Sequence, residues 1–543
     1  MIAKSMLLSA ALLGSAAAAA TAPVIDAPAG RVRGTSDGAV GVFKGIPYAQ
    51  PPVGPLRLRA PQPLPRWSGE RSAQLFGAAC VQPQGGPPSV YSSDTPMPVS
   101  EDCLTLNIWK PANARHAPVL FWIHGGALTT GSSREALYDG RRFAERGIMV
   151  VSINYRLGVL GWMAHPALSA ESPQGVSGNY GLQDQIAALQ WVRRNIAAFG
   201  GDPANVTIAG ESAGGLSGLY LMTSPAARGL FGRAILQSSY MISMPELKKP
   251  AFGLPAYEAV GQLVGAGLKA PDLAALRRLD VQTLTDSAAK LGFFPFGVVD
   301  GKLLPRQMVD VFDAGAQAPV PVLAGFNQGE IRSLRMLTPK SAASAADYER
   351  EIRARYGDLA NDFLKLYPSP DYAESILATT RDSLYGWTAE RVARKQTTLG
   401  QSAYLYLFDH GYPAMDSAGL HAFHASELPY VWGTFDGTPP RWPKVSDTPA
   451  ERAFSGAMID YWASFVRNGK PTARLGGAWP SYGKEANYLH FAAEPENRRD
   501  PMPGMFKLNE AVMCRRRAAG KDGWNWNVGL AAPTLPPRSA GCD

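Results

Sequence analysis

Short apolar segments alternate with amphipathic segments through the middle of this chain, and this alternation limits the folds open to it. The apolar runs at 119–123, 148–153 and 206–209 have the length of buried strands. Between residues 179 and 199 the apolar positions instead follow a 3.6-residue period, which predicts a helix with one buried face. Strands that alternate with helices predict an α/β fold with a mostly parallel central sheet and right-handed crossovers.

The remaining segments fit the same architecture. We expect a β-hairpin around residues 36–38, a helix at 213–222, strands at 320–324 and 403–408, and a helix at 451–466. The segment 245–400 is rich in helical patterns, and no internal repeat, long linker or abrupt change of composition divides the chain. The sequence therefore predicts one domain over residues 21–543, with helical insertions at roughly 245–400 that cover one end of the sheet.

Composition excludes several classes of protein. Hydrophobic residues make up 46% of the chain and charged residues 18%, so a large core can form and wholesale disorder is excluded. The formal net charge is +8, but no basic run is longer than 515–517. Because nucleic-acid binders gather their basic residues into a stripe or arm, we expect no nucleic-acid partner. No segment reaches about 18 uninterrupted apolar residues, so we also expect no membrane span.

The N-terminus has the pattern of a targeting segment. Lys4 is followed by an apolar stretch from Met6 to Leu13 and by small residues from 16 to 22. This pattern predicts a signal peptide over residues 1–20, cleaved near residues 20–22, and export to the periplasm or the medium. An uncleaved N-terminal anchor is the alternative.

Four cysteines remain after such a cleavage, at positions 80, 103, 514 and 542. An even count in an exported chain, with no Cys-x-x-Cys pair, favours two disulfide bonds over a metal site. Three pairings are possible, and the local one joins Cys80 to Cys103 and Cys514 to Cys542. Each bond would stabilise the fold by roughly 3 kcal/mol.

The strand predicted at 206–209 leads into a candidate nucleophile. Residues 210–214 read Gly-Glu-Ser-Ala-Gly and fit the G-x-S-x-G motif, in which a serine lies on a tight turn between a strand and a helix. Residues 34–38 fit the same motif, but Ser36 lies in the predicted hairpin turn. We therefore predict that Ser212 is the nucleophile and that Ser36 is structural.

A second motif follows the strand predicted at 119–123. Residues 124–127 read His-Gly-Gly-Ala and match the loop that supplies backbone N–H groups to the oxyanion in lipases and esterases. Such a loop must approach the substrate closely, which small residues permit. His124 is expected to support this loop rather than to transfer protons.

Together these motifs resemble the type B carboxylesterase/lipase family of α/β-hydrolases, which includes the cholinesterases and the bacterial para-nitrobenzyl esterases. The resemblance runs from about Gly30 to Tyr482. The further segments that carry it are Val-Phe-Lys-Gly-Ile-Pro-Tyr-Ala at 42–49, Pro-Pro-Val-Gly at 51–54, Ser-Glu-Asp-Cys-Leu-Thr-Leu-Asn at 100–107, Asn-Tyr-Arg-Leu-Gly at 154–158 and Phe-Gly-Gly-Asp-Pro at 199–203. The family fold is the α/β-hydrolase fold, with a mostly parallel sheet flanked by helices and helical insertions over the active-site end.

The resemblance implies a Ser-Glu-His triad in the order Ser, acid, His along the chain. It assigns the acid to Glu330, where Ile331 replaces the glycine that usually follows, and the base to His424. We expect the neighbouring Arg332 to point away from the triad, since a cation at the carboxylate would weaken its support for the imidazolium. His421 is the rival base, and a metal site made of His421, His424 and Glu427 is an alternative on helical spacing.

Other expectations follow from the resemblance alone. The oxyanion donors would be the backbone amides of Gly126, Ala127 and Ala213. Cys80–Cys103 would match the first disulfide bond of the family, and Glu101 would pair with Arg156. The implied activity is hydrolysis of a small-molecule carboxylic ester through an acyl-enzyme, with no metal or organic cofactor.

Three other functions use the same fold. A catalytically silent adhesion or binding homologue would have lost the serine or the histidine, and both are present. A lipase would need a mobile apolar lid, which hydropathy alone does not reveal. An amide hydrolase would use the same triad.

Overall fold

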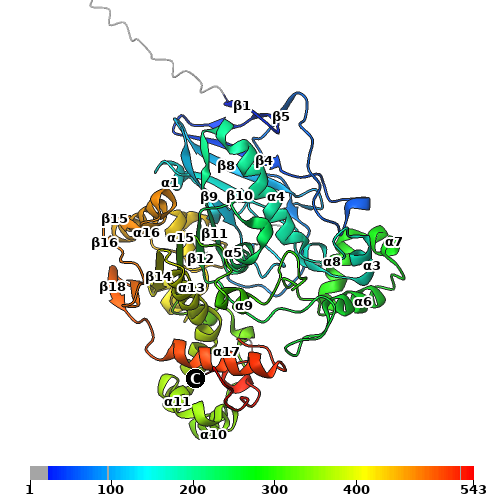
Figure 1. Ribbon diagram of the computed structural model, residues 1–543. Coiled ribbons are helices and arrows are strands. Elements are labelled where there is room, and N and C mark those ends of the chain that lie inside the picture. The colour runs from blue at the N-terminus through cyan, green and yellow to red at the C-terminus, as the bar shows by residue number, and fades with distance from the viewer. Residues whose placement is uncertain (1–21, 94–96, 526, 543) are drawn as a thin grey trace, which may run out of the picture.

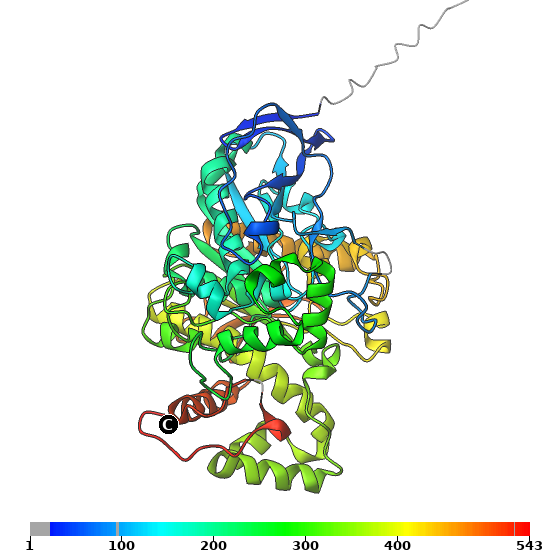
Figure 2. The same cartoon turned by 90° about the vertical axis from the view of Figure 1, so that its right-hand side faces the viewer.

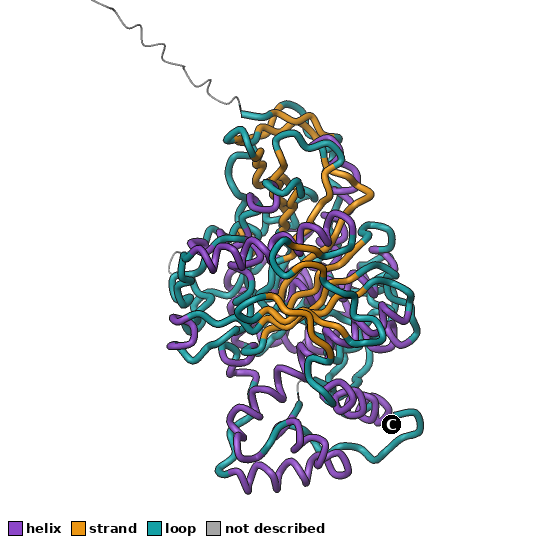
Figure 3. The backbone as a smooth tube through the Cα atoms, turned by 90° about the vertical axis from the view of Figure 1, so that its left-hand side faces the viewer, coloured by secondary structure: helices purple, strands orange, loops and turns teal. Residues whose placement is uncertain are grey.

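The computed structural model describes residues 22–93, 97–525 and 527–542. The predicted signal peptide therefore lies outside the described residues. An eleven-stranded sheet runs through the middle of the molecule, with helices packed on both sides (Figure 3). The α/β fold predicted from the sequence is confirmed.

The central strands of this sheet are parallel and its two ends are antiparallel. In spatial order the strands are β18 (Pro495–Arg499), β17 (Asn487–Phe491), β14 (Ala403–Phe408), β13 (Val322–Asn327), β12 (Arg233–Gln237), β11 (Gly201–Glu211), β9 (Ala117–Ile123), β10 (Met149–Ile153), β8 (Thr105–Pro111), β4 (Val40–Pro47) and β3 (Thr35–Ser36). The strands β17 through β10 run parallel, so their carboxyl ends share one edge. In open α/β sheets that edge is where functional residues gather.

Alternation along the strands fills a separate core on each face of the sheet. In β9, Val119, Phe121 and Ile123 belong to one buried cluster, while Leu120 and Trp122 belong to the other. The first cluster contains residues of α4 (Tyr180–Asn195), α5 (Ala213–Thr223) and α13 (Trp387–Thr398), and the second contains residues of α15 (Leu428–Trp432) and α16 (Pro449–Asn468). The period-two pattern of the strands is thus the cause of the layered structure.

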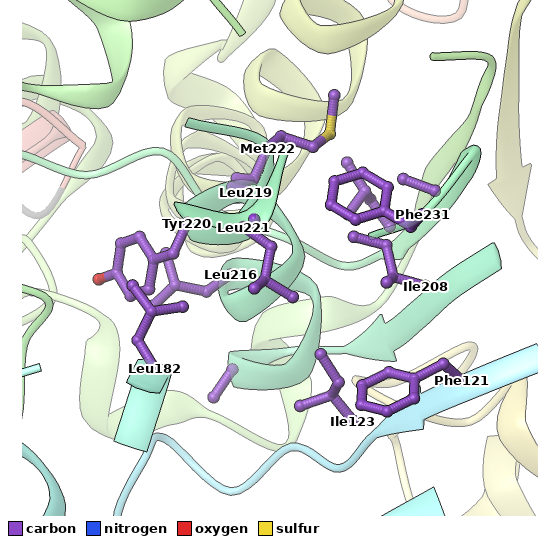
Figure 4. Close-up of a cluster of buried hydrophobic side chains, with 14 of the residues drawn as sticks. Phe121, Ile123, Leu182, Ile208, Leu216, Leu219, Tyr220, Leu221, Met222 and Phe231 are labelled. Atoms are coloured by element: carbon purple, nitrogen blue, oxygen red, sulfur yellow. The ribbon is translucent and has the colours of Figure 1, made fainter. Parts of the chain in front are cut away.

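Helix α5 lies between the sheet and other helices and is buried along its whole length. Its apolar side chains pack in one cluster with Ile123 and Ile208 of the sheet and Leu182 of α4 (Figure 4). A helix that is apolar all round is typical of a position inside the protein. The first turn of this helix, which follows Ser212, is consequently held from all sides.

The helix-rich segment 245–400 contains one strand of the sheet, β13, which divides its helices into two groups. Helices α6 (Tyr257–Gly267), α7 (Leu273–Arg278), α8 (Val281–Lys290) and α9 (Met308–Asp313) precede β13. Helices α10 (Ala345–Tyr356), α11 (Ala360–Leu366) and α12 (Tyr372–Arg381) follow it. The second group packs with α17 (Met505–Ala519) around its own apolar core, at the end of the molecule opposite β1 (Val24–Ala27) (Figures 1 and 2).

The smaller elements complete the chain. They are β2 (Gly30–Arg33), β5 (Glu70–Ser72), β6 (Ala79–Cys80), β7 (Val99–Ser100), α1 (Arg141–Ala144), α2 (Gly158–Trp162), α3 (Pro166–Glu171), the π-helical turn Asp382–Gly386, α14 (Pro413–Ser417), β15 (Thr472–Ala473) and β16 (Gly477–Ala478). No helix within the described ranges combines the length and the apolar character needed to cross a membrane.

Two disulfide bonds fasten segments at opposite ends of the chain. Cys80 bonds to Cys103, and Cys514 of α17 bonds to Cys542 near the C-terminus. Both bonds close local loops, with sequence separations of 23 and 28 residues. The second bond ties the C-terminal segment to α17.

The predicted ion pair between Glu101 and Arg156 is wrong. Glu101 pairs with Arg57, whose Nη2 lies 2.6 Å from Oε2 of the carboxylate. Arg156 pairs with Asp184 of α4, with its Nε at 2.8 Å and its Nη2 at 2.7 Å from the two carboxylate oxygens. Both arginines make bidentate pairs, and the fold brings a different carboxylate to each of them.

Candidate active site

Ser212 lies on the turn that joins β11 to α5, at the carboxyl edge of the sheet. Its backbone angles are φ 56° and ψ −121°, a conformation that costs a non-glycine residue about 1–3 kcal/mol. The surroundings hold it there, because its N–H donates to the Gln237 carbonyl at 2.9 Å. A strained serine that is fixed in this way keeps its side chain at the start of a helix, where N–H groups are free.

The glycines on either side of Ser212 are required by close packing. A Cβ at Gly214 would lie 2.0 Å from the Ile123 carbonyl oxygen, and one at Gly210 would lie 2.4 Å from the Gly214 carbonyl carbon. Both distances are far below van der Waals contact. The two glycines of the motif therefore let β9, β11 and α5 meet at this turn.

The loop after β9 reaches the same turn. A Cβ at Gly125 would be 3.2 Å from the Ser212 Cβ, which places the loop against the serine. Gly126 and Ala127 both have positive φ, 99° and 54°. Within the described part of the chain, no hydrogen bond uses the N–H of Gly126 or Ala127. Ala213 is the first residue of α5, so its N–H has no partner within the helix.

His124 supports this loop through contacts on its ring and its backbone. Its Nδ1 lies 2.9 Å from the Gly125 carbonyl oxygen, its ring stacks on Tyr155 with centroids 4.6 Å apart, and the Tyr155 hydroxyl donates to its carbonyl. Burial lowers the pKa of His124 to about 4, so the ring is neutral near pH 7. Its contacts fit the support role expected from the sequence.

His424 and Glu330 meet at the same edge, although 94 residues separate them. The His424 Nδ1 lies 2.5 Å from Glu330 Oε2, and both side chains are buried. The other oxygen of Glu330 accepts from the Ser238 hydroxyl at 2.7 Å and from the Asn327 N–H at 2.8 Å. The carboxylate is therefore fixed on both oxygens, and it in turn fixes the ring of His424.

Arg332 does not join this group. Its guanidinium pairs with Glu374 of α12 at 2.7 Å, while the neighbouring Ile331 is buried in the core. The prediction that Arg332 points away from Glu330 is confirmed.

Glu211 is a neighbour of His424 that sequence reasoning missed. Its Oε1 lies 3.1 Å from His424 Nε2, the ring nitrogen opposite the one that Glu330 binds, and that oxygen accepts no hydrogen bond from any described residue. The contact is therefore a charge interaction. Glu211 is the last residue of a parallel strand, and that position at the carboxyl edge was the available signal.

The carboxylates of Glu211 and Glu330 change the protonation equilibrium of His424. Burial lowers the pKa of His424, but the charges of Glu211 and Glu330 outweigh it and raise the pKa above its ordinary value of 6.5. Burial also raises the pKa of Glu211, while His424 opposes that shift. The imidazolium form of His424 is thus favoured by its surroundings.

The predicted rival groups lie elsewhere. His421 contacts Asp416 and Asp409 rather than Glu330. Glu427 accepts hydrogen bonds from Gln237 and Asn327, and burial raises its pKa to about 7. The three side chains of the alternative metal set, His421, His424 and Glu427, therefore have separate partners.

Known proteins are similar to this chain in both sequence and fold. The model of the carboxylesterase family matches residues 21–506. This chain belongs to the carboxylesterase family. It is 36% identical over 488 residues to the fumonisin B1 esterase of Sphingopyxis macrogoltabida, covering 86% of this chain and 85% of that protein. It is 34% identical over 475 residues to the para-nitrobenzyl esterase of Bacillus subtilis, covering 86% and 94%.

Solved structures agree with this assignment. A carboxylesterase of Geobacillus stearothermophilus superposes with a TM-score of 0.75 at 34% identity, covering 92% of this chain and all of that one. A para-nitrobenzyl esterase structure gives a TM-score of 0.76 at 32% identity, covering 90% and 99%. This carboxylesterase-family chain is thus a carboxylic ester hydrolase with an α/β-hydrolase fold.

The charge of Glu211 predicts a shift in the pH dependence of activity. Because that charge favours the imidazolium, Glu211→Gln should lower the pKa of His424. With His424 as the general base that the sequence predicts, its neutral form would then persist to lower pH, so the acidic limb of the kcat/KM profile should move to lower pH by about one unit or more. Ester hydrolysis measured from pH 5 to 9 checks this, and a limb that stays in place or moves to higher pH would contradict the assigned contact.

Proposed function

We propose that this chain is a serine carboxylesterase whose nucleophile is Ser212, whose general base is His424 and whose acid is Glu330. The observation that carries the proposal is the bond between His424 Nδ1 and Glu330, which leaves Nε2 facing Glu211, the residue before Ser212. Nε2 removes the proton as the Ser212 oxygen attacks the ester carbonyl, and the leaving alcohol then receives it. Water then attacks the acyl-enzyme while His424 takes its proton, and His424 returns that proton to the Ser212 oxygen as the carboxylic acid is released.

The oxyanion is held by the backbone amides of Gly126, Ala127 and Ala213. Two of these lie on the loop after β9 and one lies at the start of α5, so they approach the carbonyl oxygen from two elements. Removing one such donor typically costs about 3 kcal/mol of transition-state stabilisation. No step of this scheme needs a metal or an organic cofactor.

The substrate we propose is a small-molecule carboxylic ester, and the place of action is outside the cytoplasm. Two of the matching relatives are named as esterases of fumonisin B1 and of para-nitrobenzyl esters, which supports an ester substrate. Two disulfide bonds are compatible with an oxidising compartment, as the predicted signal peptide requires. A silent binding homologue is disfavoured because serine, histidine and acid are all present around one edge of the sheet.

The two serines that fit the same motif provide a matched test. Ser212→Ala should abolish hydrolysis of a p-nitrophenyl ester, with kcat falling by about 10⁴-fold or more, because the nucleophile is removed. Ser36→Ala changes the turn between β3 and β4 and should leave kcat within about twofold. Equal losses in both variants, with both folded by circular dichroism, would contradict the proposal.

The acid is tested by comparing two buried glutamates. Glu330→Gln keeps the shape but removes the charge that stabilises the imidazolium, so kcat should fall by up to about 10⁴-fold with a smaller change in KM. Glu427→Gln loses one accepted hydrogen bond and some stability, yet should retain most of kcat. An active Glu330→Gln beside an inactive, folded Glu427→Gln would show that the acid is misassigned.

A further inference from the structure

The loop that carries His424, residues 420–425, has strained backbone conformations that its surroundings must stabilise. We call these residues the histidine loop. Ala422 and Ala425 lie on either side of His424 with φ of 43° and 69°, in the left-handed region. Each costs about 1 kcal/mol or more for a residue with a side chain, so the surroundings must impose the conformation.

On its inner side the histidine loop is bound by the segment that carries the acid. The Gly329 N–H donates to the Ala422 carbonyl at 2.9 Å, and the Asn327 side chain donates to the Phe423 carbonyl at 2.9 Å. The backbones are in contact, since a Cβ at Gly329 would lie 1.7 Å from the His421 carbonyl oxygen. These contacts fix the distance between the two segments.

On its outer side the histidine loop is bound through the ring of His421. The His421 Nδ1 lies 2.8 Å from Asp416 Oδ1, and its Nε2 lies 3.0 Å from Asp409 Oδ1. A neutral imidazole has one N–H and one lone pair, so only the imidazolium can donate to both carboxylates. The geometry is therefore that of a charged histidine between two carboxylates.

The two carboxylates are themselves anchored to the fold. Asp409 follows β14, its N–H donates to the Phe491 carbonyl of β17, and its second oxygen lies 3.0 Å from Nε2 of His490. Asp416 belongs to α14. Gly411 packs directly against the ring of His421, since a Cβ at Gly411 would lie 2.6 Å from His421 Nδ1.

We propose that His421 is a positioning residue for the reaction, whose charged ring fastens the histidine loop to Asp409 and Asp416 and so holds His424 in line with Glu330 and Ser212. This inference rests on the proposed function, because it assigns His424 as the base. The ring of His421 contacts Asp409 and Asp416 rather than Glu330, so it acts on His424 through the backbone three residues away.

The effect depends on pH in a definite direction. The groups that face His421 are Asp409 after β14 and Asp416 of α14, with His490 of β17 behind Asp409; Glu330, beyond Gly329, bonds to His424. The hydrogen bonds that His421 donates to Asp409 and Asp416 raise its pKa above 6.5, and partial burial opposes that shift. The ion pairs of His421 with Asp409 and Asp416 are therefore complete below the ordinary histidine pKa, and they are lost as pH rises through the raised pKa of His421.

The size of the effect is limited by solvent. The His421 side chain is 40% exposed, so water and salt weaken both contacts. We expect a change of about fivefold in kcat, the scale of two partly exposed ion pairs, and little change in KM because the ring contacts Asp409 and Asp416 rather than the proposed catalytic side chains.

The experiment measures kcat and KM for a p-nitrophenyl ester from pH 6 to 10 in the full-length enzyme, His421→Gln, Asp416→Asn and a control. The control is His116→Asn, an exposed histidine with φ 52° in the loop before β9, which should match the wild type. His421→Gln and Asp416→Asn should each lower kcat about fivefold at pH 7 and change KM less than twofold. The wild type and His116→Asn should lose kcat on the alkaline side, whereas His421→Gln should lack that decline.

The outcomes separate this inference from the proposed function. If His421→Gln fails to fold, Asp416→Asn decides, because it changes an exposed carboxylate. Unchanged kcat and an unchanged alkaline limb in the folded variants would overturn the role of His421, while an inactive Ser212→Ala in the same assay would leave the proposed function standing. A lower kcat with the alkaline limb intact would overturn the role of the charge. A wild-type chain that fails to hydrolyse the ester would instead count against the proposed function.

Discussion

The contact of β9, β11 and α5 at the turn of Ser212 is the constraint on which the site depends. Three backbones meet there with no room for side chains at Gly210 and Gly214. This contact keeps Ser212 in a conformation that the residue would not adopt alone, and it brings the loop of Gly126 and Ala127 beside the helix N-terminus. The parallel strands supply the rest, because their carboxyl ends bring Glu330 and His424 to the same edge.

The charges around His424 give that edge its chemistry. Glu211, Glu330 and Glu427 are buried near one histidine, and two of them lie within about 3 Å of its ring nitrogens. Burial of several carboxylates is costly, which raises the pKa of Glu211 and of Glu427. The same carboxylates stabilise the imidazolium, which is the form that His424 would take on accepting the proton of Ser212 in the proposed mechanism.

Local patterns were sufficient to predict most of the architecture. The apolar runs and the helical period predicted β9, β10, α4 and α5, since these signals lie within single elements. Ser212 was separated from Ser36 by context, whereas Glu330 and His424 were assigned by the family resemblance together with the order of the triad along the chain. Pairings between distant segments could not be predicted in this way. The partners of Arg57 and Arg156, the carboxylate of Glu211 beside His424, and the bridge at His421 arise from three-dimensional contacts, for which no spacing rule exists.

The central claim is that Ser212 forms the covalent intermediate, and a fluorophosphonate that reacts with activated serines tests it most directly. The enzyme is inactivated by the probe and digested with trypsin, which releases Ser212 in the peptide Asn195–Arg228. The account predicts one probe per chain, on Ser212 of that peptide, with activity lost in proportion to labelling. Complete inactivation with the label on another residue and Ser212 unmodified would contradict it.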